Sequence, residues 1–163
     1  MKEHFLPVIW RSRRLLKSGK AAFHWENLGG LVTRDNGRTY RIFRQVMMDI
    51  PTDRPRLAGG VFCVWFTAKT SPATTIALSW KTINLFFGMR GFRSKTWVYD
   101  EVHNEFGGIY EWDTLEQAMA YRESFAMKLS SLRAVPGLFS TEVFPLEDEQ
   151  TMRHAAYRME KPA

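Results

Sequence analysis

Cysteine is nearly absent from the sequence, with Cys63 alone among 163 residues. One cysteine excludes a disulfide within the chain, and proteins without disulfides are typical of reducing compartments. No run of eighteen apolar residues is present to form a membrane-spanning helix. The first residues also lack the basic start, apolar run and cleavage site of a secretory signal. We therefore expect a cytoplasmic protein.

Motifs for metals and cofactors are also missing. The four histidines share no metal-ligand spacing, and a single cysteine cannot build a structural zinc site. Neither the Gly-x-Gly-x-x-Gly pattern of dinucleotide-binding domains nor a P-loop occurs. The sequence therefore predicts neither a metal site nor a bound nucleotide cofactor.

Positive charge is concentrated at one end of the chain. Residues 1–60 hold 12 Lys and Arg against 5 Asp and Glu, whereas residues 61–163 hold 11 against 12. A nucleic-acid-binding domain needs a basic face of its own, so the near-neutral remainder argues against nucleic acid as a partner. In the basic part, cationic and apolar residues interleave as in an amphipathic helix, with Arg11, Arg13, Arg14, Lys17 and Lys20 as the cations. Such a helix either makes weak contact with an anionic membrane surface or packs as an ordinary helix on the domain.

Aromatic residues, by contrast, are abundant, at 14% of the chain with six tryptophans. Aromatic side chains carry the largest buried areas. Their excess indicates an aromatic-lined pocket, a large buried interface or an aromatic-rich core.

A linker with two prolines at 49–56 precedes the elements of a small domain. Residues 61–67 form an unbroken apolar run, which predicts a strand covered on both faces. Ser71-Pro72 predicts the start of a helix, which Gly88 and Gly91 end. The helix carries one apolar stripe at spacings of four, three and four, made of Ile76, Trp80, Ile83 and Phe87.

A hairpin and a second helix follow. Residues 93–99 and 106–112 have the period of strands and flank a polar turn. Asp113 is a good helix cap, with Glu116 in the capping-box position. We expect this helix to run to about Val135, where Pro136-Gly137 stops it, and 138–146 to form the last strand.

The resulting order, β-α-β-β-α-β, predicts an α+β fold of the ferredoxin-like kind. We assign this domain to residues 59–148, with a basic extension over 1–58 and a tail over 149–163. In the extension, Asp35-Asn36-Gly37 predicts a hairpin turn. Helices on one side leave the other face of the sheet bare, yet the first strand is apolar on both sides. A second sheet is the simplest cover, which predicts a homodimer.

The hairpin carries a family resemblance. Its first strand contains Lys95-Thr96-Trp97, its second contains Gly107-Gly108-Ile109-Tyr110, and the following helix contains Ala120-Tyr121. In this order the motifs resemble those of YdhR-like monooxygenases, which belong to the dimeric α+β barrel superfamily together with the antibiotic-biosynthesis monooxygenases. The resemblance covers about 61–147, just over half of the chain, and the first 60 residues have no counterpart in the family pattern.

The resemblance implies a homodimer whose two sheets close into a barrel, with a pocket between the sheet and the helices of each protomer. It also implies oxygenation of a planar aromatic or polycyclic compound without flavin, haem or metal. Fold alone does not settle the reaction. A non-catalytic module of the same fold, which binds a small molecule or another partner, is the alternative.

Alternation places four residues of the second hairpin strand on one sheet face, namely Phe106, Gly108, Tyr110 and Trp112. An aromatic cage of this kind suits a planar, mostly apolar phenol or quinol. The expected substrate-binding residues are Trp80, Trp97, Gly107, Gly108, Trp112 and Tyr121. Paired glycines in a strand indicate either a ligand against the bare backbone or a β-bulge. Tyr121 either hydrogen-bonds in the pocket or packs the helix on the sheet.

Four polar residues are candidates for the polar roles, Tyr110, Asn84, Arg93 and His103, and we assign the first three to catalysis because a histidine in a turn is commonly just solvated. A cofactor-free oxygenase needs a base to deprotonate the substrate and a donor to stabilise the anion that forms. Arg93 suits the second role, although an arginine at a strand edge also commonly faces water.

Overall fold

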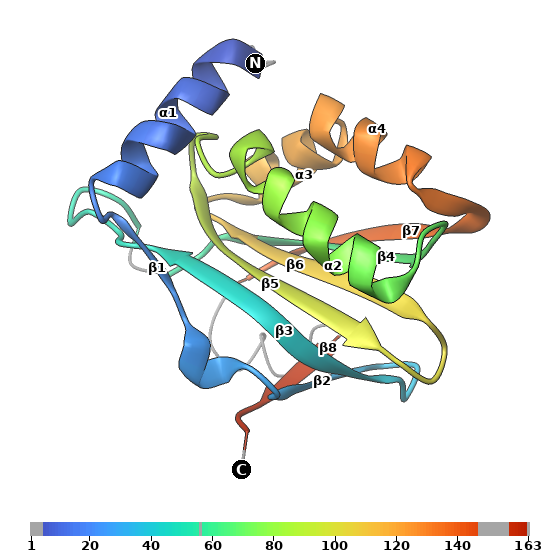
Figure 1. The fold of residues 1–163 in the computed structure, drawn as a ribbon. Coiled ribbons are helices and arrows are strands. Elements are labelled where there is room, and N and C mark those ends of the chain that lie inside the picture. The colour runs from blue at the N-terminus through green and yellow to red at the C-terminus, as the bar shows by residue number, and fades with distance from the viewer. Residues whose placement is uncertain (1–4, 56, 147–156, 163) are drawn as a thin grey trace.

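The computed structural model describes residues 5–55, 57–146 and 157–162, and their strands form one sheet (Figure 1). The strand order is β7-β4-β6-β5-β3-β2-β8, with β1 paired to β3 outside this path, and every pairing is antiparallel. The elements are α1 (Phe5–Lys17), β1 (Ala21–Phe23), η1 (Trp25–Asn27), β2 (Leu31–Arg34), β3 (Thr39–Met48), β4 (Gly60–Ala68), α2 (Pro72–Lys81), η2 (Ile83–Leu85), β5 (Phe92–Asp100), β6 (Glu105–Trp112), α3 (Leu115–Arg122), α4 (Phe125–Leu132), β7 (Ala134–Pro145) and β8 (Tyr157–Glu160).

The predicted ferredoxin-like α+β fold is confirmed. From β4 to β7 the elements follow the expected order, and α2, α3 and α4 lie on one face of the sheet (Figure 1). The β5–β6 hairpin is also confirmed. Its turn is held by Asp100, which accepts hydrogen bonds from the backbone N–H of Val102 and of His103.

The apolar run of β4 is buried on both faces, as predicted, because each face belongs to a different core. Phe62 and Val64 point into the core between the sheet and the helices. Val61, Cys63 and Trp65 point into a second core on the opposite face of the sheet. Full burial of side chains of this size contributes about 2 kcal/mol each, so both cores stabilise the sheet.

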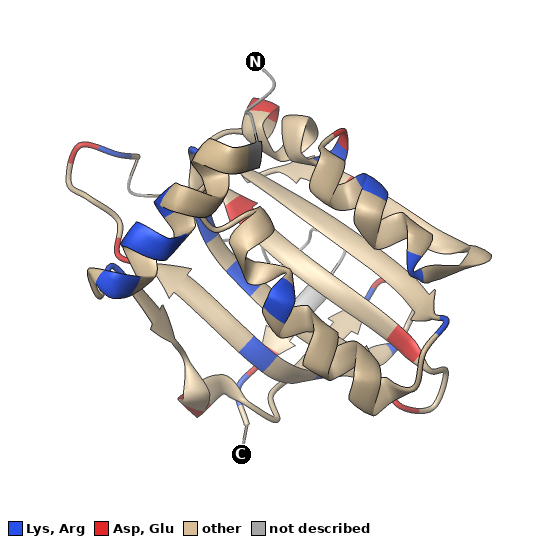
Figure 2. Cartoon of the chain, turned by 45° about the horizontal axis from the view of Figure 1, so that its top comes forward, with Lys and Arg blue, Asp and Glu red and all other residues tan. Residues whose placement is uncertain are grey.

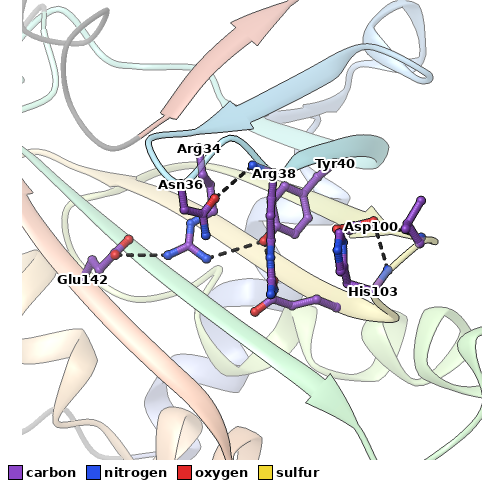
Figure 3. Close-up of polar contacts among 9 residues, drawn as sticks. Arg34, Asn36, Arg38, Tyr40, Asp100, His103 and Glu142 are labelled. Atoms are coloured by element: carbon purple, nitrogen blue, oxygen red, sulfur yellow. Dashed lines mark hydrogen bonds and ion pairs between the residues drawn. The ribbon is translucent and has the colours of Figure 1, made fainter.

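The second core is covered from within the same chain. The predicted hairpin at 35–37 is confirmed as the β2–β3 turn, and β3 extends the sheet by pairing with β5. The sheet curls so far that Arg34 of β2 meets Glu142 of β7, with 3.2 Å between Nη2 and Oε1 (Figure 3). Arg34 also lies 4.2 Å from the centre of the Trp65 ring. The apolar face that seemed to need a second sheet is thus packed by β2 and β3, and homodimerisation stays a prediction.

The helix after β4 differs from its prediction. Ser71 caps it, as expected, by accepting from the backbone N–H of Thr74, and Pro72 occupies the first turn. However, α2 ends at Lys81, and a short 3-10 helix carries Ile83. The buried residues of α2 are Thr75 and Ser79. The predicted stripe through Ile76 and Trp80 is therefore wrong, because small hydroxyl residues face the sheet.

The second helix is broken in two. Thr114 rather than Asp113 is its N-cap, with Gln117 completing the capping box, because the Asp113 carboxylate is held by Arg54 and Arg93. Ser124 then caps a separate helix, α4, by accepting from the backbone N–H of Met127.

The final strand begins earlier than predicted, at Ala134, and includes Pro136 and Gly137. Among the described strands, β7 pairs with β4 alone. The missing N–H of proline is tolerated in such an edge strand, so Pro136-Gly137 does not separate helix from strand. Of the expected tail, 149–156 and 163 lie outside the described residues, and β8 pairs with β2.

The predicted basic helix at the N-terminus is confirmed as α1. It packs through Val8 and Ser12 against the segment between α2 and β5. Arg11 donates to the carbonyl oxygen of Gly88 at 2.6 Å, and Ser12 donates to that of Asn84 at 3.2 Å. Among the described residues, no helix is both long and apolar enough to cross a membrane.

Candidate functional site

A cleft lies between the sheet and the helices α2 and α4. Its sheet side is aromatic, formed by Phe43, Phe66, Trp97, Phe106 and Tyr110. Its helix side carries hydroxyl groups, from Thr75, Ser79, Thr82 and Ser130. The inward residues of α2 are small and fill less of the space between helix and sheet than Leu or Phe would. The unfilled space is a cleft of about 50 Å³.

Lys95 of β5 is a buried amine in this cleft. Its side chain is only 5% exposed, and its Nζ lies 4.3 Å from the ring centres of Trp97 and Tyr110 and 4.4 Å from that of Phe86. Rings at this distance attract an ammonium group through their electron-rich faces. Burial nevertheless lowers the pKa of Lys95 well below 10.5, and the positive charges of Arg44 and Arg133 lower it further.

Two guanidinium groups accompany Lys95. Arg44 of β3 is buried, donates to the Ser79 hydroxyl, and lies 3.7 Å from the Trp80 ring centre. Burial lowers the pKa of Arg44 to about 10. Arg133, at the end of α4, lines the cleft and is half-buried, and burial lowers its pKa as well. The cleft is therefore electropositive.

Tyr110 is the buried phenol of the cleft. It is 3% exposed, and its ring centre lies 4.8 Å from that of Tyr121. Burial raises the pKa of Tyr110 well above its ordinary value of 10.0. At neutral pH this hydroxyl is protonated and can donate a hydrogen bond, but it is a poor base.

The structure brings four of the predicted site residues together, since Trp97, Gly107, Gly108 and Tyr110 all line the cleft. The two glycines differ in what their missing side chains would meet. A Cβ on Gly107 would lie 2.4 Å from the Trp65 ring in the second core, whereas one on Gly108 would face Tyr110, Val64 and Lys95. Their pairing with β4 is continuous, so no β-bulge explains them.

The other predicted substrate-binding residues lie next to the cleft. Trp112 and Tyr121 are each 1% exposed in the core between sheet and helices, with ring centres 5.0 Å apart. Trp80 is 44% exposed on the outer side of α2, where it covers Arg44. None of these three residues lines the cleft among the described residues.

Two predicted catalytic residues also lie elsewhere, and their roles stay predictions. Asn84 is on η2, and its side-chain oxygen is buried without a hydrogen-bond partner among the described residues. Arg93 donates to Asp113 at 2.8 Å and to the carbonyl oxygen of Pro55 at 2.7 Å. Arg54 also binds both carboxylate oxygens of Asp113, each at 2.7 Å. The contacts of Arg93 and Arg54 therefore hold the 49–55 segment against the sheet.

Sequence reasoning missed the cationic residues of the cleft, although one signal was present. Lys95 shares its strand face with Trp97 by simple alternation, so a cationic residue beside the aromatic cage could have been found. Arg44 and Arg133 come from β3 and the end of α4, which only the tertiary fold brings to the same place.

No group of three His, Cys, Asp or Glu side chains suited to a metal occurs within the described part of the chain.

A wider depression of about 470 Å³ lies between α1 and the start of β5. Arg54 and Asp113 line it and are paired with each other. Its cations are thus at least partly neutralised within the chain, unlike those of the aromatic cleft.

Comparison with known proteins gives structural likenesses only. No protein-family model matches the sequence, and the curated proteins give no match. Two solved structures from Listeria monocytogenes are similar. One is an uncharacterized ferredoxin-fold protein related to antibiotic biosynthesis monooxygenases, at 13% identity and a TM-score of 0.52 over 91% of this chain and 90% of that one. The other is the heme-degrading enzyme LmHde, at 15% identity and 0.51 over 88% and 94%. At these identities the likeness concerns the fold alone, which is the ferredoxin-like fold found in proteins related to those monooxygenases.

Proposed function

We propose that the chain is a monooxygenase-type enzyme, of the YdhR-like kind, that oxygenates a planar aromatic compound without flavin, haem or metal. The observation that carries the proposal is the cleft itself, where rings from four strands surround a buried amine and a buried phenol. A site that only bound an apolar molecule would need neither group. The likeness in fold to monooxygenase-related proteins supports the same reading.

The proposed reaction uses the substrate as its own reductant. A CH₂ group conjugated to a carbonyl, as in an anthrone, or the hydroxyl of its enol form loses a proton, and the resulting enolate gives electrons to O₂. The overall balance is R₂CH₂ + O₂ → R₂C=O + H₂O, so one oxygen atom enters the product and the other leaves as water. The protein supplies a base, a donor for the developing oxyanion and a site shielded from water. Tyr110 is the donor in this scheme, because its raised pKa keeps the hydroxyl protonated.

Binding of a ring system requires the cleft to widen, since about 50 Å³ holds little more than water. Arg133 is the side chain best placed to move, because the residue is only half-buried and its guanidinium has no hydrogen bond or ion pair to a described residue. We also propose a homodimer that pairs through its sheets. Such a dimer would leave the helix-covered side of each protomer, where the cleft lies, accessible to substrate. Light scattering of the purified chain tests the dimer.

The test is oxygen consumption by the purified chain with a panel of anthrones, quinols and catechols and no added cofactor. We expect uptake with at least one class, and a loss of about a hundredfold in Tyr110→Phe, as for removal of one oxyanion donor elsewhere. Trp25→Phe is the control, since Trp25 is 60% exposed on η1. Asn84→Ala, measured beside it, tests the predicted role of the amide.

Absence of uptake with every compound, together with tight binding of one of them by tryptophan quenching, would contradict the oxygenase. That result would favour the non-catalytic binding module instead.

A further inference from the structure

The cations of the cleft lack acidic partners. Lys95 and Arg44 are 5% and 4% exposed, yet neither forms an ion pair with a carboxylate of the described residues, and nor does Arg133. A buried cation without a counter-ion is unfavourable. Charge of this kind in a cleft suits a ligand that supplies the missing negative charge.

The acidic residues of the neighbouring strands are all engaged elsewhere. Glu111 accepts from Ser94, and Glu105 accepts from Arg38 and Tyr40. Glu142 accepts from Arg34 and Trp65, and Asp113 binds two arginines. Asp100 holds the β5–β6 turn.

The groups that face Lys95 are therefore rings, hydroxyls and other cations. Its own strand provides Trp97, β6 provides Tyr110, and the segment after η2 provides Phe86. The helix side provides Thr75, Ser79 and Ser130. Arg44 from β3 and Arg133 after α4 are the charged groups whose fields reach it.

We propose that Lys95 takes the proton from an acidic hydroxyl of a planar aromatic substrate and then pairs with the anion that forms. The proposal rests on the proposed function and deepens it, because it names the base and narrows the substrate to phenols and enols. An isolated apolar ring would leave Arg44 and Arg133 without a counter-ion.

The step conserves charge within the cleft. The O–H bond of the substrate breaks, its electron pair stays on oxygen, and the proton forms a new bond to Nζ of Lys95, which gives an oxyanion beside an ammonium group. The oxyanion is then close to the positive charges of Arg44 and Arg133. The ammonium group is close to the oxyanion and to the electron-rich faces of three rings. Lys95 is present as the free amine because burial and the two arginines disfavour its charged form, and the anion that forms beside it stabilises the ammonium group.

The test uses 2-naphthol, whose phenolate absorbs at longer wavelength than the neutral form, and 2-methoxynaphthalene, which has no proton to give. At a pH where free 2-naphthol is protonated, we expect the bound ligand to show the phenolate band. The proton stays in the complex, so calorimetry in two buffers of different ionisation enthalpy should give the same heat. We expect 2-naphthol to bind at least about tenfold more tightly than the ether.

Three variants separate proton transfer from simple attraction of anions. Lys95→Met should abolish the phenolate band at the same pH and bring the two probes to similar affinity, while Lys128→Met, on the exposed side of α4, should behave as the wild type. Lys95→Arg is permanently charged and has no free amine, so its phenolate complex should release one proton to the buffer. Circular dichroism checks that each variant folds.

A phenolate band retained in Lys95→Met, or a proton released to the buffer by the wild type, would overturn the proposal. Equal binding of the ether, or no binding of either probe, would overturn it too. These outcomes are independent of oxygen uptake, because the assay involves no turnover. A phenolate complex without oxygen consumption would refute the oxygenase but leave the proton transfer standing.

Discussion

At the scale of single residues, neighbours on β6 serve opposite sides of the sheet. The Cβ position of Gly107 faces the Trp65 ring, and that of Gly108 faces the cleft. One glycine is thus required by packing within the second core, whereas the other keeps space beside Lys95 and Tyr110. The two positions form a matched pair for separating stability from function.

Gly107→Ala should destabilise the fold by about 1–3 kcal/mol, because its Cβ would lie 2.4 Å from the Trp65 ring and 2.6 Å from Val98. In Gly108→Ala the nearest atoms lie at 3.0, 3.2 and 3.5 Å, so we expect a smaller loss of stability and weaker ligand binding. Urea unfolding and probe binding measure the two effects. Equal loss of stability in both variants would contradict this assignment.

The sequence was informative about residues wherever strand alternation applied. Phe106, Gly108 and Tyr110 were predicted to share a face, and they do line one cleft. The prediction failed for Trp80, because α2 ends at Lys81 and presents Thr75 and Ser79 to the sheet. An apolar stripe is a poor guide for a helix that borders a polar cleft. Convergence of Arg44 and Arg133 depends on long-range pairing that periodicity does not contain.

At the scale of elements, α1 presents one face to the fold and another to solvent. Val8 and Ser12 are buried, whereas Leu6 is 68% and Trp10 is 76% exposed. Arg13 and Lys17 continue this exposed stripe at helical spacing, and basic residues recur along α1 (Figure 2). Both interpretations of the basic helix are therefore compatible with its position, since it packs on the domain through one side only.

We expect the exposed stripe of α1 to bind weakly to vesicles that contain phosphatidylglycerol and not to pure phosphatidylcholine vesicles. Each basic residue near an anionic surface contributes about 1 kcal/mol. The double variant Arg13→Gln, Lys17→Gln should therefore lose most of the binding measured by co-sedimentation. Lys81→Gln with Lys128→Gln is the control of equal charge on other helices. Similar binding to neutral vesicles would argue against a charge-dependent contact.

Helix boundaries were the weakest part of the prediction at this scale. A single helix from Asp113 to Val135 was expected, yet Ser124 begins a new one. Both Asp113 and Thr114 are suitable caps by type, and the ion pairs of Asp113 with Arg54 and Arg93 decide between them. Such a choice depends on residues about 20 and 60 positions away, which local patterns do not include.

At the scale of the whole molecule, one curled sheet separates the two cores. The order of strands and helices from β4 to β7 followed from the sequence, because each has a clear period or cap. The curl did not, because it depends on β2 and β3 folding back across the second core. This is also why the sequence seemed to require a partner's sheet on that face.

The contact of β2 with β7 gives a test of this closure. Glu142 accepts from Arg34 at 3.2 Å and from the Trp65 indole at 2.9 Å. Glu142→Gln should lower the free energy of unfolding by about 1–2 kcal/mol, since one donor loses its charged acceptor. It should also speed amide hydrogen exchange in β2. Glu123→Gln, at a 73% exposed side chain, is the control, and an equal effect there would contradict a special role for Glu142.

The basic side chains buried in the cleft without acidic partners lower the stability of the fold, although the proposed activity needs them. Between its lowered native pKa and 10.5, Lys95 binds more protons in the unfolded chain than in the native one, so the native state loses stability as the pH falls through that range. Replacement of Lys95 by an apolar residue removes this loss. Selection of variants for heat resistance alone would therefore favour the removal of Lys95. The most thermostable variants obtained in this way would be the ones least able to bind an acidic substrate.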